Sequence, residues 1–235
     1  MQRLAVMQPY FFPYPGYFQL IRAVDTFVFM DDVHFIKNGW VNRNRILIGG
    51  SPAWLTVPCK NVSSNRLIRE TRHHLNPSNK KKLLRKVEQA YCKAPFFDAV
   101  FPLFTGVFDE ETSLISELAM RSVRLTCGYL GIRTPFSISS TDHAGSIHHG
   151  RSGRIISICR QHGIRNYVNA PGGRELYKPE EFRMHHIELR FLQPGPMEYL
   201  QFNRPFVPNL SVLDALMFNS KEDMATMMER YTLVA

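Results

Sequence analysis

The stretch LAVMQPYFFPYPGYFQLIRAVDTFVFM, residues 4–30, decides the fold because it predicts how a sheet begins. Residues 4–7 are apolar and typical of a short buried strand, and residues 26–30 are typical of a second one. Between the two, residues 16–23 have the apolar spacing of a helix that buries one face. We therefore expect a Rossmann-like β-α-β start with parallel strands.

The connection between the first strand and the helix is rich in rings, because residues 9–18 hold six Phe and Tyr residues and three prolines. Such a run is either a plug of the hydrophobic core or the wall of a site. Proline fixes the backbone φ angle, so the loop is expected to be stiff. We expect Tyr10, Tyr14 or Tyr17 to present rigid faces to a sugar or a base, and a core role for the phenylalanines is compatible with this.

The rest of the chain continues the alternation of strands and helices after an interruption. Glycine and proline at 49–52 predict a hairpin turn between two short strands. The further predicted elements are strands at 67–71, 136–138, 166–169 and 187–192, helices at 154–162 and 179–185, and two helices near the C-terminus. We predict one α/β domain over residues 1–235, with a mostly parallel sheet and an inserted helical lobe at about 76–131.

The composition excludes a fibrous, disordered or disulfide-stabilised chain. The 235 residues are 44% hydrophobic and 21% charged, which is typical of a globular protein. The four cysteines form no CxxC pair, so neither disulfides nor a zinc site is expected, and no metal ligands are predicted. The first apolar run is too short for a signal peptide and no stretch approaches a membrane span, so we expect a cytoplasmic protein.

The net charge of +9 favours anionic partners, but nucleic acid, nucleotide sugars and anionic membrane surfaces share that property. The densest basic run, Lys80–Lys86, is interpreted as the solvated face of a helix. It also suits a partner such as an acyl donor on a carrier protein. We expect a phosphorylated small molecule as the substrate and no binding of nucleic acid.

The loop after the second predicted strand, DDVHFIKNGWVNRNR at 31–45, has the densest set of functional groups. Asp31 and Asp32 are paired carboxylates, which suit a general base or a metal ligand. The alternative is a surface loop with ion pairs. We predict a site here, with Asp31 and Asp32 as the catalytic residues.

The other polar residues of this loop suit the binding of a substrate. Lys37 and Arg43 are typical of clamps on phosphate, and Trp40 offers a face for stacking. Asn42 and Asn44 supply amides that orient a ligand. We predict that all five residues bind the substrate.

A third loop, NAPGGRELY at 169–177, also lies between a predicted strand and a helix. Gly172 and Gly173 allow the backbone to approach a phosphate or a sugar closely, and Arg174 adds a cation. A Gly-Gly pair is equally typical of a simple turn. We predict a contribution to substrate binding from these three residues, and from Gln201 as a supporting group.

Known catalytic motifs are absent from the sequence: there is no P-loop, GxGxxG or GxSxG. SISSTDHAG at 137–145 is similar to the phosphate-contacting stretch of nucleotidyltransferases, but PYPGYFQLI lacks the histidines that those enzymes carry. Cys92 lies in a helical block away from the loops, so it is not expected to act as a nucleophile. We therefore expect the acceptor to attack the transferred group directly, without a covalent intermediate on the enzyme.

Several separated blocks of the sequence resemble the WbqC-like protein family over essentially the whole chain. They are residues 7–47, WLTVP, YCKAPFF, LGIRTP, YVNAPGGRELY and FVPNLSVLDALMFNS. The family pattern coincides with Gln8, Pro9, Gly16, Asp31, Asp32, Lys37, Trp40, Asn42, Arg43, Asn44, Gly173 and Gln201. His34 and Cys92 depart from it, which weakens both as catalytic groups, and Gln8 joins the expected substrate-binding residues.

The resemblance implies a link to bacterial surface-polysaccharide and O-antigen gene clusters. We expect an enzyme of precursor synthesis that transfers an acyl or aminoacyl group to a nucleotide-linked amino sugar, with its cofactor unknown. The alternatives are a non-catalytic protein that binds a nucleotide sugar or glycan, and a nucleotidyltransferase-like enzyme.

Overall fold

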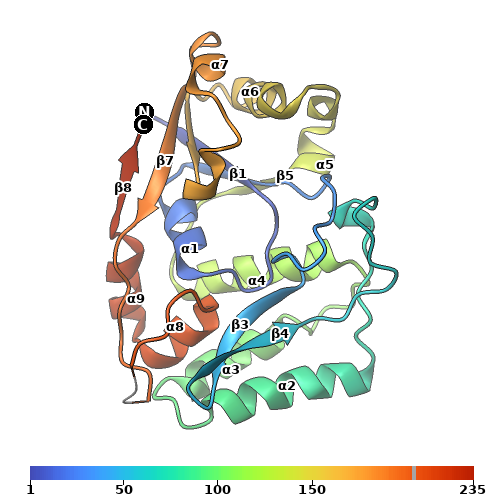
Figure 1. Cartoon of the computed structure of the whole chain (residues 1–235), viewed down its shortest axis with the longest axis vertical. Helices are drawn as coiled ribbons and strands as arrows, with labels where there is room; N and C mark the ends of the chain where they lie inside the picture. Colours follow the sequence, from blue (N-terminus) through green and yellow to red (C-terminus); the bar gives the residue numbers. More distant parts are fainter. Residues whose placement is uncertain (203–204) are drawn as a thin grey trace.

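The computed structural model describes residues 1–202 and 205–235, and within them six strands form one sheet at the centre of the molecule (Figure 1). They are β1 (Arg3–Met7), β2 (Thr26–Phe29), β5 (Phe136–Ile138), β6 (Asn166–Asn169), β7 (Glu188–Pro194) and β8 (Tyr231–Val234). The order is β5-β2-β1-β6-β7-β8, and every pairing is parallel except that of β7 with β8. The predicted α/β fold with a mostly parallel sheet is confirmed.

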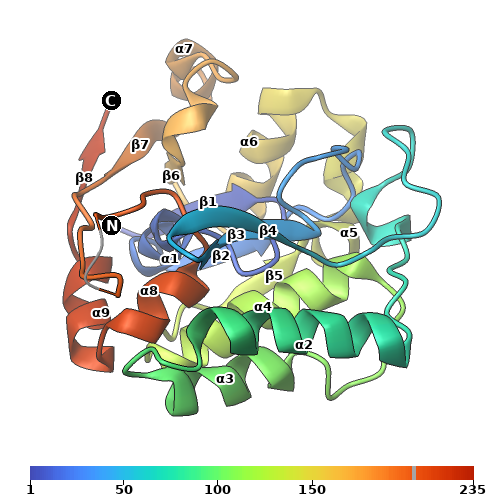
Figure 2. The same cartoon turned by 60° about the horizontal axis from the view of Figure 1, so that its bottom comes forward.

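Helices cover both faces of the sheet, and the two layers differ in size (Figure 2). Side chains alternate between the faces of a strand, so Ala5 joins the larger core while Leu4 and Val6 join the smaller one. The larger layer holds α1 (Pro15–Arg22), α2 (Pro77–Tyr91), α3 (Phe97–Gly106), α4 (Ile115–Tyr129), α8 (Val212–Phe218) and α9 (Lys221–Met228). The smaller layer holds α6 (Arg151–Gln161) and α7 (Pro179–Arg183).

Residues 76–131 contain α2, α3 and α4. Asn76 begins α2, since its side chain accepts a hydrogen bond from the Asn79 N–H. The buried side chains of the three helices belong to the same core as the larger sheet face. The antiparallel hairpin of β3 (Arg43–Ile48) and β4 (Ser51–Thr56) packs beside α2 (Figure 2).

One local prediction is wrong, and one strand is missing from the predicted elements. Residues 67–71 do not form a strand, because Ile68–Glu70 is a short 3-10 helix. The Glu70 side chain accepts a hydrogen bond from the Leu67 N–H, and the Thr71 hydroxyl donates to the Leu67 carbonyl, so side chains hold the turn. The strand β8, four residues at the edge of the sheet after the last helix, is absent from the predicted elements.

The course of the chain marks one edge of the sheet as the place for a ligand. The chain runs from β1 to β2 and out to β5, and then returns to the other side of β1 as β6. In open α/β sheets, ligands bind beyond the carboxyl ends of the strands where the order reverses. That position lies between β1 and β6. No helix in the described part of the chain is long and apolar enough to cross a membrane.

Candidate functional site

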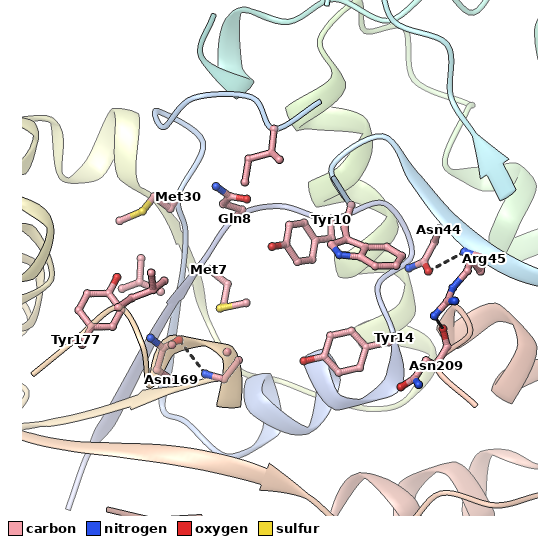
Figure 3. Close-up of a pocket in the computed structure, with 17 residues that line it drawn as sticks. Met7, Gln8, Tyr10, Tyr14, Met30, Asn44, Arg45, Asn169, Tyr177 and Asn209 are labelled. Carbon is pink, nitrogen blue, oxygen red and sulfur yellow. Dashed lines mark hydrogen bonds between the residues drawn. The ribbon is translucent and has the colours of Figure 1, made fainter. Parts of the chain in front are cut away.

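A cavity of about 570 Å³ opens at the carboxyl ends of β1 and β6 (Figure 3). This size is within the range of roughly 300–1,000 Å³ that is usual for small-molecule sites. Strand ends, the ring-rich loop, the segment before β3 and the loop after β6 all contribute to its wall. The lining residues include Met7, Gln8, Tyr10, Tyr14, Met30, Trp40, Asn44, Arg45, Asn169, Gly173, Tyr177 and Asn209.

The ring-rich loop is held in a strained conformation. Phe12 is buried and has a φ of 41°, in the left-handed region that non-glycine residues rarely adopt. Its N–H donates to the Ser122 hydroxyl at 2.9 Å, and its carbonyl accepts from Asn44 Nδ2 and Ser211 Oγ, both at 2.7 Å. Groups from α4, β3 and the start of α8 thus hold both peptide groups of Phe12.

Both roles considered for the loop are present. Phe11 and Phe12 are fully buried in the larger core. Tyr10 and Tyr14 line the cavity, and their hydroxyls point into it (Figure 3). Tyr17 is buried and does not line the cavity, and its hydroxyl donates to the Gln8 carbonyl at 2.8 Å. Tyr17 therefore supports the loop.

The two cavity tyrosines are hydrogen-bond donors at neutral pH. Burial, followed by the neighbouring Tyr14, raises the pKa of Tyr10 to about 12. Burial also raises the pKa of Tyr14. Neither hydroxyl has a hydrogen-bond partner among residues 1–202 and 205–235. Each proton is therefore available to a ligand.

Arg45 supplies a positive charge to the cavity wall. Its Nη2 donates to the Asn209 carbonyl at 3.0 Å, while its buried Nε has no partner in the described part of the chain. No carboxylate in that part forms an ion pair with Arg45. A buried donor without an acceptor is costly, so this side chain favours an anionic or polar ligand.

Two asparagines at the cavity hold its backbone. The Asn169 Oδ1 accepts from the Ala170 N–H at 2.8 Å, and its amide lies where a side chain at Gly173 would be. A side chain at position 173 would therefore require the Asn169 amide to move. Asn44 uses both amide atoms internally, since its Oδ1 accepts from the Arg45 N–H at 2.8 Å.

Asp31 and Asp32 lie outside the cavity wall and are buried among internal partners. Asp31 accepts from the Ser140 N–H at 3.1 Å and from the Ser140 hydroxyl at 2.8 Å. Asp32 accepts from the Ser139 hydroxyl and pairs with the guanidinium of Arg154. The pair joins the end of β2 to α5 (Ser139–Asp142) and α6. Their predicted catalytic role remains a prediction.

The cavity brings together half of the predicted substrate-binding residues, namely Gln8, Tyr10, Trp40, Asn44, Gly172 and Gly173. The other six are Tyr17, Lys37, Asn42, Arg43, Arg174 and Gln201, and they do not line it. Lys37 and Arg174 are exposed, and Asn42 Nδ2 donates to the Val57 carbonyl at 2.9 Å. Arg43 stacks on Trp54 outside the cavity, with its guanidinium 4.0 Å from the ring.

Gln201 belongs to a buried cluster around Asp214. The Asp214 carboxylate accepts from Gln201 Nε2 at 2.5 Å, from the Tyr199 hydroxyl at 2.7 Å and from the Tyr91 hydroxyl at 2.8 Å. The Leu47 N–H donates to the Tyr91 hydroxyl at 3.0 Å. This cluster joins β3, α2 and α8, and we call it the Asp214 cluster.

Sequence reasoning missed several cavity residues. Arg45 and Asn169 lie at the ends of loops that the sequence had already indicated, and Met30 ends a predicted strand. These positions at the ends of strands and loops could have indicated a role in the cavity. Nothing in the sequence indicates Asn209, because it is 164 residues from its partner Arg45 in the chain.

These features define an α/β protein with a ligand cavity at the reversal of its strand order. The chain belongs to the WbqC-like protein family, whose sequence profile matches residues 8–226. It is 30% identical over 223 residues to an uncharacterized protein, Rv1507c, of Mycobacterium tuberculosis, covering 93% of this chain and 94% of that one. No solved structure shows a significant match.

Proposed function

We propose that the cavity binds the sugar of a nucleotide-linked amino sugar and that the protein transfers an acyl or aminoacyl group to it, in the synthesis of a bacterial surface polysaccharide. Arg45 carries this proposal, because its guanidinium has no carboxylate partner in the described part of the chain and lines the same cavity as the hydroxyls of Tyr10 and Tyr14, at the reversal of the strand order. Aromatic faces, amides and one cation suit a polar ring with an attached phosphate. The polysaccharide role rests on the family resemblance.

In this proposal the amine of the sugar attacks the acyl carbon of an activated donor. A C–N bond forms, the bond to the leaving group breaks, and the proton of the amine leaves with solvent. The Tyr10 hydroxyl, kept protonated by its raised pKa, donates to the developing oxyanion. No Ser or Cys of the described residues lines the cavity, so we propose no covalent intermediate.

Asp31 and Asp32 take a positioning role here rather than that of a general base. Their partners Ser139, Ser140 and Arg154 hold the end of β2 against α5 and α6. The nucleotidyltransferase-like alternative loses support, because the residues at 139–140 contact these carboxylates rather than the cavity.

A non-catalytic binding protein is the second candidate. One observation favours it, since no carboxylate or imidazole of the described residues lines the cavity. Tyr10→Phe distinguishes the candidates when assayed with UDP-N-acetylglucosamine analogues that carry a free amine. An enzyme loses turnover while it keeps ligand affinity, whereas a binding protein forms no product with any acyl donor.

The proposal is tested by the affinity of Arg45→Ala for a UDP-linked amino sugar, measured by calorimetry. Loss of a charge-assisted hydrogen bond is expected to weaken binding at least about tenfold. Arg183→Ala is the matched control, because Arg183 is an exposed arginine on α7. Equal affinity of wild type and Arg45→Ala would contradict the proposal.

A further inference from the structure

Both tryptophans of the chain lie side by side at the mouth of the cavity. Trp40 precedes β3 and Trp54 lies in β4, with ring centroids 5.6 Å apart. The Arg43 guanidinium lies 4.0 Å from the Trp54 ring. We call these three residues the outer stack. Trp40 and Trp54 remain 38% and 41% exposed, which is a large apolar surface to leave in water.

The outer stack is positively charged. Arg43 Nε donates to the Gly39 carbonyl at 3.3 Å and its Nη2 to the Asn38 carbonyl, so the guanidinium is fixed by backbone alone. In the residues that the structure describes, no carboxylate pairs with it. Lys86 Nζ adds a cation, because it donates to the Trp54 carbonyl at 2.6 Å. A planar ring next to negative charge fits this surface.

Trp40 and Arg45 connect the outer stack to the cavity. Trp40 lines the cavity and also contacts Trp54. The Arg45 guanidinium is 5.8 Å from the Trp40 ring, and Arg45 pairs with Trp54 across the hairpin. Arg45 therefore lines the cavity and also lies next to both indoles of the outer stack. A ligand that contacts Arg45 in the cavity is close to the exposed indoles.

We propose that the outer stack binds the nucleobase of a ligand whose sugar occupies the cavity, and that Arg45 holds the diphosphate between them. This inference rests on the proposed function for the identity of the sugar. Stacking on an aromatic ring accepts any base, because every base has a π face. Arg43 adds a second charge near the diphosphate and a planar group against the ring.

The test uses tryptophan fluorescence of the full chain, because its only two tryptophans report on this surface. The probes are UDP, GDP, UDP-N-acetylglucosamine and N-acetylglucosamine 1-phosphate. We expect the nucleotides to change the tryptophan emission. Calorimetry with Trp54→Ala should give at least about tenfold weaker binding of the nucleotides. The affinity for the sugar phosphate should stay unchanged.

Two further variants keep the test decisive if Trp54→Ala does not fold. Trp54→Phe retains a ring and should retain most of the nucleotide affinity. Arg43→Ala keeps both indoles and should weaken the nucleotides, whereas Arg183→Ala, which removes the same charge far from the site, should not.

The outcomes separate this inference from the proposed function. If UDP-N-acetylglucosamine binds and the variants at Trp54 and Arg43 keep full affinity, the outer stack is not a base site and the proposed function stands. Binding of the sugar phosphate without binding of UDP or GDP would likewise overturn the base site alone. If none of the four probes binds, both proposals are wrong.

Discussion

The Asp214 cluster and the cavity wall each combine two tyrosine hydroxyls with an ionisable group. They differ in whether these polar groups have hydrogen-bond partners within the protein. In the Asp214 cluster, three donors reach one carboxylate, and the Tyr91 hydroxyl also accepts from a backbone N–H. At the cavity, the hydroxyls of Tyr10 and Tyr14 and the Nε of Arg45 have no partner in the described chain. Satisfied buried groups hold a fold together, whereas unsatisfied ones at a cavity are available to a ligand.

The largest expected effect comes from breaking the satisfied cluster. Tyr91→Phe leaves the Leu47 N–H and one oxygen of Asp214 without a partner in the core, so we expect a loss of about 3 kcal/mol in the free energy of unfolding. Tyr14→Phe removes a hydroxyl without a partner and should cost less than about 0.5 kcal/mol. Urea denaturation of both variants measures this. Equal losses would remove the distinction between the two clusters.

Gly173→Ala tests how tightly the cavity backbone is packed. The added methyl group meets the amide of Asn169, so we expect a cost of about 2 kcal/mol from overpacking. In an Asn169→Ala background the same change should cost little, which a double-mutant cycle in urea detects. If the losses of unfolding free energy from Gly173→Ala and Asn169→Ala simply added, the Asn169 amide would not be what opposes a methyl group at position 173.

The pH dependence of stability tests the charge in the Asp214 cluster. Burial raises the pKa of Asp214 above its ordinary value of 3.8, although three donors oppose the shift. The Asp214 carboxyl therefore ionises at a lower pH in the unfolded chain than in the native protein. Its contribution to the free energy of unfolding is fully present below pH 3.8 and is lost as pH rises through the native pKa. Each unit of separation between the two pKa values corresponds to about 1.4 kcal/mol.

The side chain of Asp214→Asn cannot ionise. The difference between its free energy of unfolding and that of the wild type should therefore shrink as pH rises from about 4 to about 7. Urea denaturation over that range measures the difference, and Asp98→Asn at an exposed position is the control. If the loss of unfolding free energy in Asp214→Asn grew with pH instead, the native state would favour the ionised carboxylate of Asp214.

A small change in stability is also expected at Arg45, whose buried Nε has no partner in the described part of the chain. Arg45→Met keeps much of the length of the side chain and removes the buried Nε, at the loss of one bond to Asn209. We expect the free energy of unfolding to change by less than about 1 kcal/mol, while nucleotide-sugar binding weakens at least about tenfold. A large loss of stability would give Arg45 a structural role like that of Asp214.

The fold was predictable where the decisive pattern is local. The apolar runs at 4–7 and 26–30 became β1 and β2, and the two helices predicted near the C-terminus are α8 and α9. The edge strand β8 was missed because four residues after a helix carry too little pattern.

The site was predictable only in part, because its contacts join distant parts of the chain. The loop at 31–45 drew attention by its composition, yet Asp32 meets Arg154 across 122 residues and Arg45 meets Asn209 across 164. No spacing rule connects such pairs. Lys37 and Arg43 look like Arg45 in the sequence, yet of these three cations Arg45 alone lines the cavity.

The strained peptide at Phe12 links the site to the whole length of the chain. Its three hydrogen bonds come from residues 44, 122 and 211, so the peptide is fully held only when all three are in place. During synthesis on the ribosome, the first loop emerges long before Ser211 does. The nascent chain therefore holds this loop beside the cavity only after residue 211 has emerged, and a fragment that stops before α8 would lack that contact.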